Sequence, residues 1–249
     1  EYQSRLKARV ANHEITYEWK DGEMWLDSKM ILQNRNQEML SEIVLYLNPT
    51  LEIYSLKEAD SDVSYHRDLQ VIILERQLLP DDSISLHISY KGKIDEAICY
   101  LDVPFEERHN VGRYDPGMRR GLFNFGTRFA YLEENYTLLH PEVLWYPVAV
   151  PPVNMVSPYA REINFTEYTL RVKTWEGQQV LSQGVPEYGT GEVSFKNRQK
   201  LSGITLCIGD YHKKEIEFGG LQLEFYYFPG HELFFEGYTE IQGEKLSKV

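Results

Sequence analysis

The 249-residue sequence contains only two cysteines, Cys99 and Cys207. A framework of several disulfides is therefore excluded, and neither thiol has a partner cysteine or histidine at the spacing of a zinc site. A single disulfide between the two stays open, although two buried free thiols are the favoured interpretation. Long apolar runs are also absent, so no segment has the length of a membrane span or the pattern of a signal peptide.

Positive charge is scarce. The chain has 26 Lys and Arg against 38 Asp and Glu, which gives a formal net charge of −12. Binding to a nucleic-acid backbone requires clustered basic side chains, so nucleic acid is excluded as a partner. The acidity itself is interpreted as a contribution to solubility.

The motifs of common catalytic centres are missing as well. His13 and His231 are each followed by Glu, as in the helix of a zinc protease, but that helix needs a second histidine four residues later. Tyr17 and Phe235 occupy those positions, so both histidines are interpreted as surface or boundary residues. There is no Gly-x-Ser-x-Gly turn and no glycine-rich phosphate loop. We therefore predict that this chain is not itself an enzyme and holds no metal.

Aromatic residues and short alternating runs are abundant. Aromatics make up 13% of the chain, with 18 tyrosines, a composition that favours strands. Apolar and polar residues alternate at 15–19 and 24–32, on either side of Asp21-Gly22, which predicts a β-hairpin. The runs at 216–218 and 221–227 predict a second one. We expect an all-β fold, either a large antiparallel β-sandwich or a curved sheet.

Two segments depart from this pattern. Residues 102–120 are rich in proline and glycine and are predicted to be a loop or an insertion. Residues 229–249 are expected to form a linker and then a short helix. Because that pattern still runs at the last residue, and because the first residue is Glu1, we expect the sequence to be a piece of a longer protein.

The segment 129–185 carries the most distinctive features. An aromatic and proline cluster, Trp145-Tyr146-Pro147, leads through a proline-rich crossing into a strand at 168–174. This strand is expected to turn near Gly177 and to return as a hairpin that ends at Gly184. Adjacent carboxylates at Glu133 and Glu134 precede the cluster.

Four tryptophans offer an alternative reading. Trp19, Trp25, Trp145 and Trp175 could stack on sugars or on the side chains of a partner, although packing within the protein is the commoner use of such residues. A free-standing β-sandwich module that binds carbohydrate or peptide is therefore kept as the alternative function.

The order of these features resembles the amino-terminal β domain of the M1 family of zinc aminopeptidases. In particular, it resembles the divergent M1-like region fused to bacterial ABC-type transporter permeases. The resemblance spans about residues 10–228. It is carried by MILQN at 30–34, LYLNP at 45–49, ISLHISYKG at 84–92, GLF at 121–123, PEVLWYP at 141–147 and the segment 168–184, which ends in Ser-Gln-Gly.

The resemblance implies a saddle-like β domain at 1–228 and, at 229–249, the linker and first helix of a following domain. The implied function is non-catalytic. The domain would pack against the catalytic-type zinc metallopeptidase domain of the same chain and help to shape its cleft. Zinc would belong to that domain, and no cofactor is expected here. The implied location is the extracytoplasmic soluble part of a bacterial membrane-associated protein.

In active members of the family, a Gln or Glu of this β domain binds the free α-amino group of the substrate. By position that role falls to Glu133, Glu134 or Asn135, so the resemblance implies a peptide anchor there. A carboxylate suits the role because it accepts charge-assisted hydrogen bonds from an ammonium group. The family's acidic Asp-Glu-Pro is absent after the tryptophan cluster, where residues 148–152 read Val-Ala-Val-Pro-Pro. Within the cluster, Trp145 is interpreted as part of a structural turn.

Overall fold

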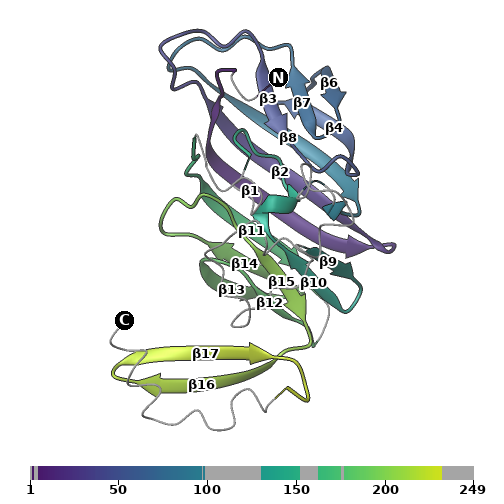
Figure 1. The fold of residues 1–249 in the computed structure, drawn as a ribbon, viewed down its shortest axis with the longest axis vertical. Helices are drawn as coiled ribbons and strands as arrows, with labels where there is room; N and C mark the ends of the chain where they lie inside the picture. Colours follow the sequence, from purple (N-terminus) through teal and green to yellow (C-terminus); the bar gives the residue numbers. More distant parts are fainter. Residues whose placement is uncertain are drawn as a thin grey trace, which may run out of the picture.

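The computed structural model describes residues 5–96, 130–151, 162–174 and 177–231, together with Tyr2 and Ile98. Within these residues the chain consists almost entirely of β-strands, which form four sheets (Figure 1). The all-β prediction is therefore confirmed. The predicted loop at 102–120, Cys99 and the predicted helix after residue 231 lie outside the described residues.

The largest sheet contains eight strands in the order β13-β14-β11-β1-β2-β8-β4-β5. All of its strand pairs are antiparallel except β1 with β11, which is parallel. Asp21 and Gly22 form the predicted tight turn between β1 and β2, with φ of 56° and 77°. The strands are β1 (Arg9–Lys20), β2 (Glu23–Gln33), β4 (Glu52–Glu58), β5 (Ser61–Asp62), β8 (Ser83–Gly92), β11 (Glu167–Lys173), β13 (Val185–Gly189) and β14 (Glu192–Lys196).

Three smaller sheets complete the described structure. One has the order β3-β7-β6, one has the order β12-β15-β10-β9, and β16 and β17 form a two-stranded hairpin. The hairpin extends away from the rest of the molecule (Figure 1). The strands are β3 (Ile43–Tyr46), β6 (Tyr65–Asp68), β7 (Val71–Leu74), β9 (Ala130–Glu133), β10 (Tyr136–Leu139), β12 (Gln179–Leu181), β15 (Leu206–Gly209), β16 (His212–Phe218) and β17 (Leu221–Tyr227).

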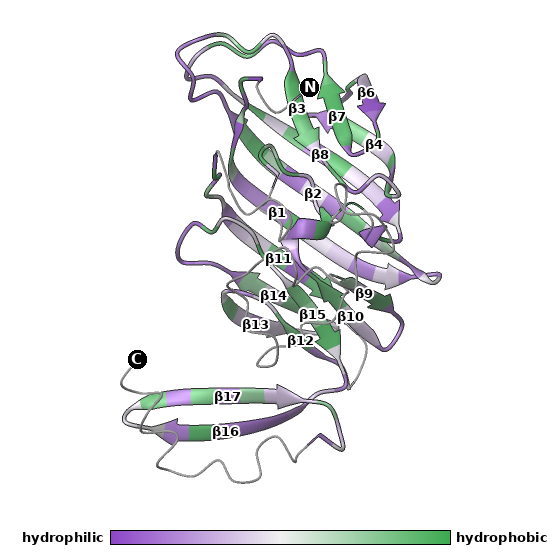
Figure 2. Ribbon diagram, viewed as in Figure 1, coloured by the Kyte–Doolittle hydropathy of each residue, from purple (hydrophilic) through white to green (hydrophobic). Residues whose placement is uncertain are grey.

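One core lies against the inner face of the eight-stranded sheet. Every second residue of β2, from Met24 to Leu32, is no more than 1% exposed, as period-two alternation requires. All four residues of β3 and of β7 are buried, and Figure 2 shows both strands as almost uniformly apolar. Strands covered on both faces have this pattern.

The tryptophan cluster is part of this core. Trp145 and Tyr146 are buried, with their rings in an edge-to-face contact at 4.7 Å. The backbone N–H of Ile204 donates a hydrogen bond of 3.0 Å to the hydroxyl oxygen of Tyr146. A short 3₁₀ helix, η4 (Pro141–Val143), precedes the cluster. The cluster thus ties the segment after β10 to the loop before β15.

The predicted hairpin at 168–184 is wrong. β11 pairs with β1 and β14, whereas β12 pairs with β15 in a different sheet. β12 has only three residues, so it offers β11 little to pair with, while β14 provides a five-residue partner. Ion pairs on the outer face link β11 to its parallel neighbour β1, since Arg171 contacts Glu14 at 3.1 Å and Lys173 contacts Glu18 at 2.7 Å.

Two further findings concern the membrane and the thiols. In the described part of the chain, no helix is long and apolar enough to span a membrane. Cys207 is a half-buried free thiol on β15, and burial raises its pKa to about 11. A thiol with a raised pKa is a poor nucleophile at neutral pH.

Candidate functional site

The three residues predicted as a peptide anchor lie together at the tip of one hairpin. Glu133 pairs with Tyr136, which leaves Glu134 and Asn135 as the two-residue connection between β9 and β10. All three side chains are exposed. The backbone oxygen of Glu134 accepts a hydrogen bond of 3.4 Å from the side chain of Gln178. The tip is therefore an accessible acidic turn, and its role as an anchor stays a prediction.

An aromatic cluster connects this tip to the β16–β17 hairpin. The ring of Tyr136 lies 5.4 Å from that of Tyr131 and 5.2 Å from that of Phe228. Phe228 also stacks on Tyr211 at 4.7 Å. Tyr211 directly precedes β16 and Phe228 directly follows β17. The two chain segments at the base of the hairpin are therefore attached to β10. Burial raises the pKa of Tyr136 and that of Tyr211.

The β16–β17 hairpin is amphipathic. Its register places Ile216 opposite Leu223 and Lys213 opposite Tyr226, on alternate faces. On the charged face, Lys213 pairs with Glu215 at 2.5 Å and with Glu224 at 2.6 Å. The other face carries Ile216 together with Leu221, Leu223, Phe225 and Tyr227, and also His212 and Lys214 at its open end. Figure 2 shows β17 as largely apolar.

The apolar face of the hairpin is separate from the main core. None of the residues on this face whose burial the structure describes belongs to the buried core, and Leu221 is 52% exposed. Within the described ranges no third strand pairs with the hairpin. Sequence reasoning predicted this hairpin correctly but did not identify its isolation, because alternation says nothing about what covers a face.

His13 is not a surface residue, which corrects the interpretation made from the sequence. It is 1% exposed, with its ring 5.6 Å from that of Tyr146 and 5.9 Å from that of Tyr168. Burial lowers its pKa to about 3. The alternation of β1 contained the signal, since residue 13 shares a face with the buried Ile15 and Tyr17. His231, in contrast, is exposed.

The described residues were compared with two kinds of catalytic arrangement, a metal site and a nucleophile triad. They contain no group of three or more His, Cys, Asp or Glu side chains that could hold a metal ion. Asp27 accepts hydrogen bonds from Ser89 at 2.5 Å and from His87 at 3.1 Å. A nucleophile triad needs the histidine between serine and carboxylate, and here the carboxylate lies between them. Ser89 is therefore not activated by this arrangement.

The tryptophans in the described residues do not form an open stacking platform. Trp145 is fully buried, and Trp19 packs against the core. Trp25 is half-buried on the outer face of the large sheet, but the ammonium groups of Lys91 and Lys20 lie 4.6 and 5.4 Å from its ring centroid. These cation–π contacts compete with any sugar for the ring. Trp175 lies outside the described residues.

Comparison with known proteins identifies the fold. No protein-family profile matches the sequence, and no curated protein matches it. Solved structures do match. A two-domain M1 zinc metallopeptidase bound to L-tryptophan superposes with a TM-score of 0.60 at 14% identity, over 92% of this chain and 52% of that one.

Two other structures agree. An M1 zinc metallopeptidase from Deinococcus radiodurans gives a TM-score of 0.59 at 14% identity, over 92% of this chain and 52% of its own. Aminopeptidase A of Legionella pneumophila, in complex with aspartic acid, gives a TM-score of 0.60 at 14% identity. The match covers 91% of this chain and 25% of the Legionella protein. The chain thus has the fold of the amino-terminal β domain of M1 metallopeptidases, as the sequence resemblance implied. It spans about half the length of the first two of these M1 zinc metallopeptidase structures.

Proposed function

We propose that this chain is a non-catalytic β domain that packs against an M1-like, catalytic-type zinc metallopeptidase domain of the same longer protein and helps to shape its cleft. The observation that supports this proposal most strongly is the β16–β17 hairpin. It has an apolar face outside the core and no third strand in the described structure.

A two-stranded hairpin of this kind is poorly stable by itself. Independent stability in water generally needs a third strand or packing of an apolar face. The aromatic cluster holds only the base of this hairpin, where Tyr211 stacks on Phe228. A partner that covers the face with Leu221 would remove apolar surface from water and order the strands. The following domain is the partner we propose for it.

The same cluster brings the acidic tip close to the proposed interface. Tyr136 directly follows the turn that carries Glu133, Glu134 and Asn135, and its ring contacts Phe228 at the end of the hairpin. A domain docked on the hairpin would therefore have these side chains at its border. In that arrangement, a carboxylate of the tip would accept hydrogen bonds from the free ammonium group of a peptide.

The wider setting is also part of the proposal. Its support is the sequence resemblance to the M1-like region of bacterial ABC-type transporter permeases. The longer protein would be membrane-associated, with this domain on the extracytoplasmic side. Zinc, where present, would be bound by the following domain and not by the residues described here.

The test compares residues 1–249 with a longer chain of the natural protein that includes the next domain. Hydrogen exchange should be fast along β16–β17 in the short chain and clearly slower in the long one. Zinc analysis and aminoacyl reporter substrates complete the comparison. Equal exchange in both chains, or stoichiometric zinc with hydrolysis by residues 1–249 alone, would overturn the proposal.

The alternative of a free-standing carbohydrate- or peptide-binding module gains no specific support. The side chain that best suited it, Trp25, already has Lys20 and Lys91 over its ring. A glycan array distinguishes the two functions, because saturable binding of a defined glycan would favour the module.

A further inference from the structure

The sheet formed by β9, β10, β12 and β15 has two faces of different character. One face points into the main core, and its residues Ala130, Thr137 and Leu206 are no more than 3% exposed. Cross-strand partners share a face, so the register defines which residues lie on the other side. This second surface, the Cys207 face, carries one row of Tyr131, Leu138, Cys207 and Leu181 and another of Glu133, Tyr136, Gly209 and Gln179.

The Cys207 face is largely apolar without being part of the main core. Glu133 is the only charged residue in the two rows. The cores of protein interfaces are likewise poor in charge and rich in aromatic side chains, whereas small molecules bind in concave sites. A sheet face of this composition therefore suits a protein partner. Its half-buried side chains, none of which belongs to the main hydrophobic core, are Tyr131, Tyr136, Leu138, Leu181 and Cys207.

The aromatic cluster at the base of the β16–β17 hairpin lies on this face. A Cβ atom at Gly209 would lie 2.9 Å from Cε2 of Tyr211 and 3.4 Å from Cε1 of Phe228. The glycine thus lets both rings approach the backbone of the sheet closely. Tyr136, in the same row, has its ring 5.2 Å from that of Phe228. The Cys207 face and the hairpin therefore meet at this cluster, and the hairpin extends from that end of the sheet (Figure 1).

We propose that the Cys207 face is part of the surface on which the following M1-like domain docks. This inference rests on the proposed function and extends it from the hairpin to a second surface. Covering the face would remove the apolar side chains of Leu138 and Leu181 from water, which provides a driving force. Cys207 lies between these two leucines in the register, so docking would also bury its thiol.

Chain connectivity favours the following domain over a free partner. Phe228 is part of the cluster on the face, and the chain continues from Phe228 through Pro229 towards the proposed domain. A domain tethered beside the face has an effective concentration on the order of millimolar. One domain can cover both surfaces, because Phe228 contacts Tyr136 of the sheet and stacks on Tyr211 at the base of the hairpin. A second copy of the chain would lack the advantage of the tether.

Alkylation of Cys207 tests the proposal without altering the face. Residues 1–249 and a longer chain of the natural protein that includes the next domain, both carrying Cys99→Ser, are treated with iodoacetamide. Mildly alkaline pH is required, because burial raises the pKa of the Cys207 thiol to about 11 and the thiolate is the reactive form. We expect the rate in the longer chain to be lower by about tenfold or more, since a docked domain admits the reagent only when it opens.

Two variants show where the protection arises. Ser194→Cys, in a background with Cys99→Ser and Cys207→Ser, is the matched control. Residue 194 is half-buried on β14, opposite Arg171 on the outer face of the large sheet, and should be alkylated equally in both lengths. Leu138→Lys places a charge on the Cys207 face and should restore rapid alkylation of Cys207 in the longer chain. Thermal melts verify that the variants fold.

Equal alkylation of Cys207 in the two lengths would overturn the proposal. If hydrogen exchange along β16–β17 nevertheless slows in the longer chain, the proposed function stands and only docking on the Cys207 face is lost. If neither measurement changes, both fail. A Cys207 thiol that is already unreactive in residues 1–249 would also overturn the proposal, because the face would then be covered without the following domain. Sedimentation velocity would show whether a second copy of the chain covers it.

Discussion

The eight-stranded sheet and the β16–β17 hairpin are built from the same sequence pattern, yet they differ in what covers them. In β2 the alternate residues from Met24 to Leu32 are no more than 1% exposed. In β17 the alternation is equally regular, but Leu221 is 52% exposed and Leu223 is only half-buried. The period-two alternation of apolar and polar residues therefore determines which residues share a face of a strand. The rest of the fold determines whether that face is covered.

The difference separates the residues that stabilise the domain from those available to a partner. Deleting a buried side chain leaves a cavity, whereas deleting an exposed one mainly removes surface that water already contacts. The comparison is therefore testable by stability measurements on residues 1–249 alone. Effects should be large in the core and close to zero on the apolar face of the hairpin.

The largest effect is expected for Trp145→Ala. Trp145 is fully buried and packs edge-to-face on Tyr146. Removing the indole should lower the free energy of unfolding by about 3–5 kcal/mol, the range typical of aromatic deletions in cores. Urea unfolding followed by circular dichroism measures this change, and Trp25→Ala on the outer face is the comparison. A decrease in the free energy of unfolding below about 1 kcal/mol for Trp145→Ala would contradict the assignment of this residue to the core.

A pH-dependent effect of similar size is expected at His13. Its pKa is about 3 in the folded chain and near 6.5 when unfolded, so below pH 6.5 the unfolded state binds the additional proton. Stability should therefore fall as the pH drops from 6.5 towards 3, by about 1.4 kcal/mol per pH unit. Between pH 6.5 and 4.5 the loss amounts to about 2 kcal/mol, because the unfolded histidine is already half protonated at pH 6.5.

His13→Phe isolates this contribution, because the carboxylates titrate equally in both proteins. The variant should lack the extra loss of stability between pH 6.5 and 4.5, while His87→Gln on the outer face should retain it. Unfolding curves at four pH values give the slope of the free energy of unfolding against pH. Equal slopes for His13→Phe and the unaltered chain would show that His13 becomes protonated without penalty in the folded state.

Local patterns in the sequence were sufficient to predict the all-β class and both long hairpins. Asp21-Gly22 and Gly219-Gly220 supply the positive φ that these turns require. Pairing between distant strands could not be predicted in the same way. The parallel β1–β11 pair joins residues more than 150 positions apart, and nothing in either strand identifies the other as its neighbour.

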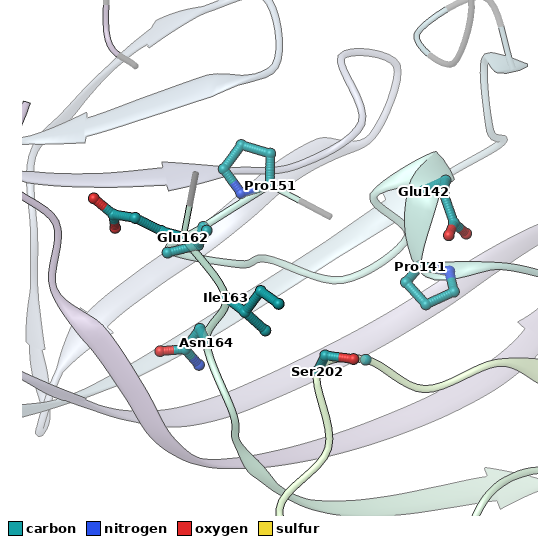
Figure 3. A pocket seen from close by; sticks show the side chains of 9 residues that line it. Pro141, Glu142, Pro151, Glu162, Ile163, Asn164 and Ser202 are labelled. Carbon is teal, nitrogen blue, oxygen red and sulfur yellow. The ribbon is translucent and has the colours of Figure 1, made fainter. Parts of the chain in front are cut away.

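The candidate site was predictable only in part. Glu133, Glu134 and Asn135 were named as alternatives for a peptide anchor; they lie on one exposed turn, and the anchor role stays a prediction. The contact of Tyr136 with Phe228 connects segments separated by 92 positions, so it could not be inferred from spacing. A groove beside η4 could not be predicted for the same reason, because its walls come from η4, the segment 162–166 and the loop before β15 (Figure 3).

An intermediate effect is expected for Gly203→Ala in the loop before β15. A Cβ atom at this position would lie 2.8 Å from Cγ of Pro141 and 3.1 Å from the hydroxyl oxygen of Tyr146. The proline ring cannot move aside easily, so the substitution should cost about 1–3 kcal/mol through overpacking. Gly189→Ala is the control, because its nearest neighbour, the backbone oxygen of Glu192, is 3.5 Å away. Equal stability of the two variants would argue against close packing of η4 on this loop.

The smallest effect is expected for Leu221→Ser on the apolar face of the hairpin. Half of this side chain already contacts water, so the free energy of unfolding of residues 1–249 should change by no more than about 0.5 kcal/mol. In a longer chain that contains the following domain, the same substitution should destabilise by about 1–2 kcal/mol, because it places a polar group in an apolar interface. Differential scanning calorimetry of both lengths provides the measurement. A large loss in the short chain would mean that the hairpin is already covered, whereas no loss in the long chain would mean that its partner binds elsewhere.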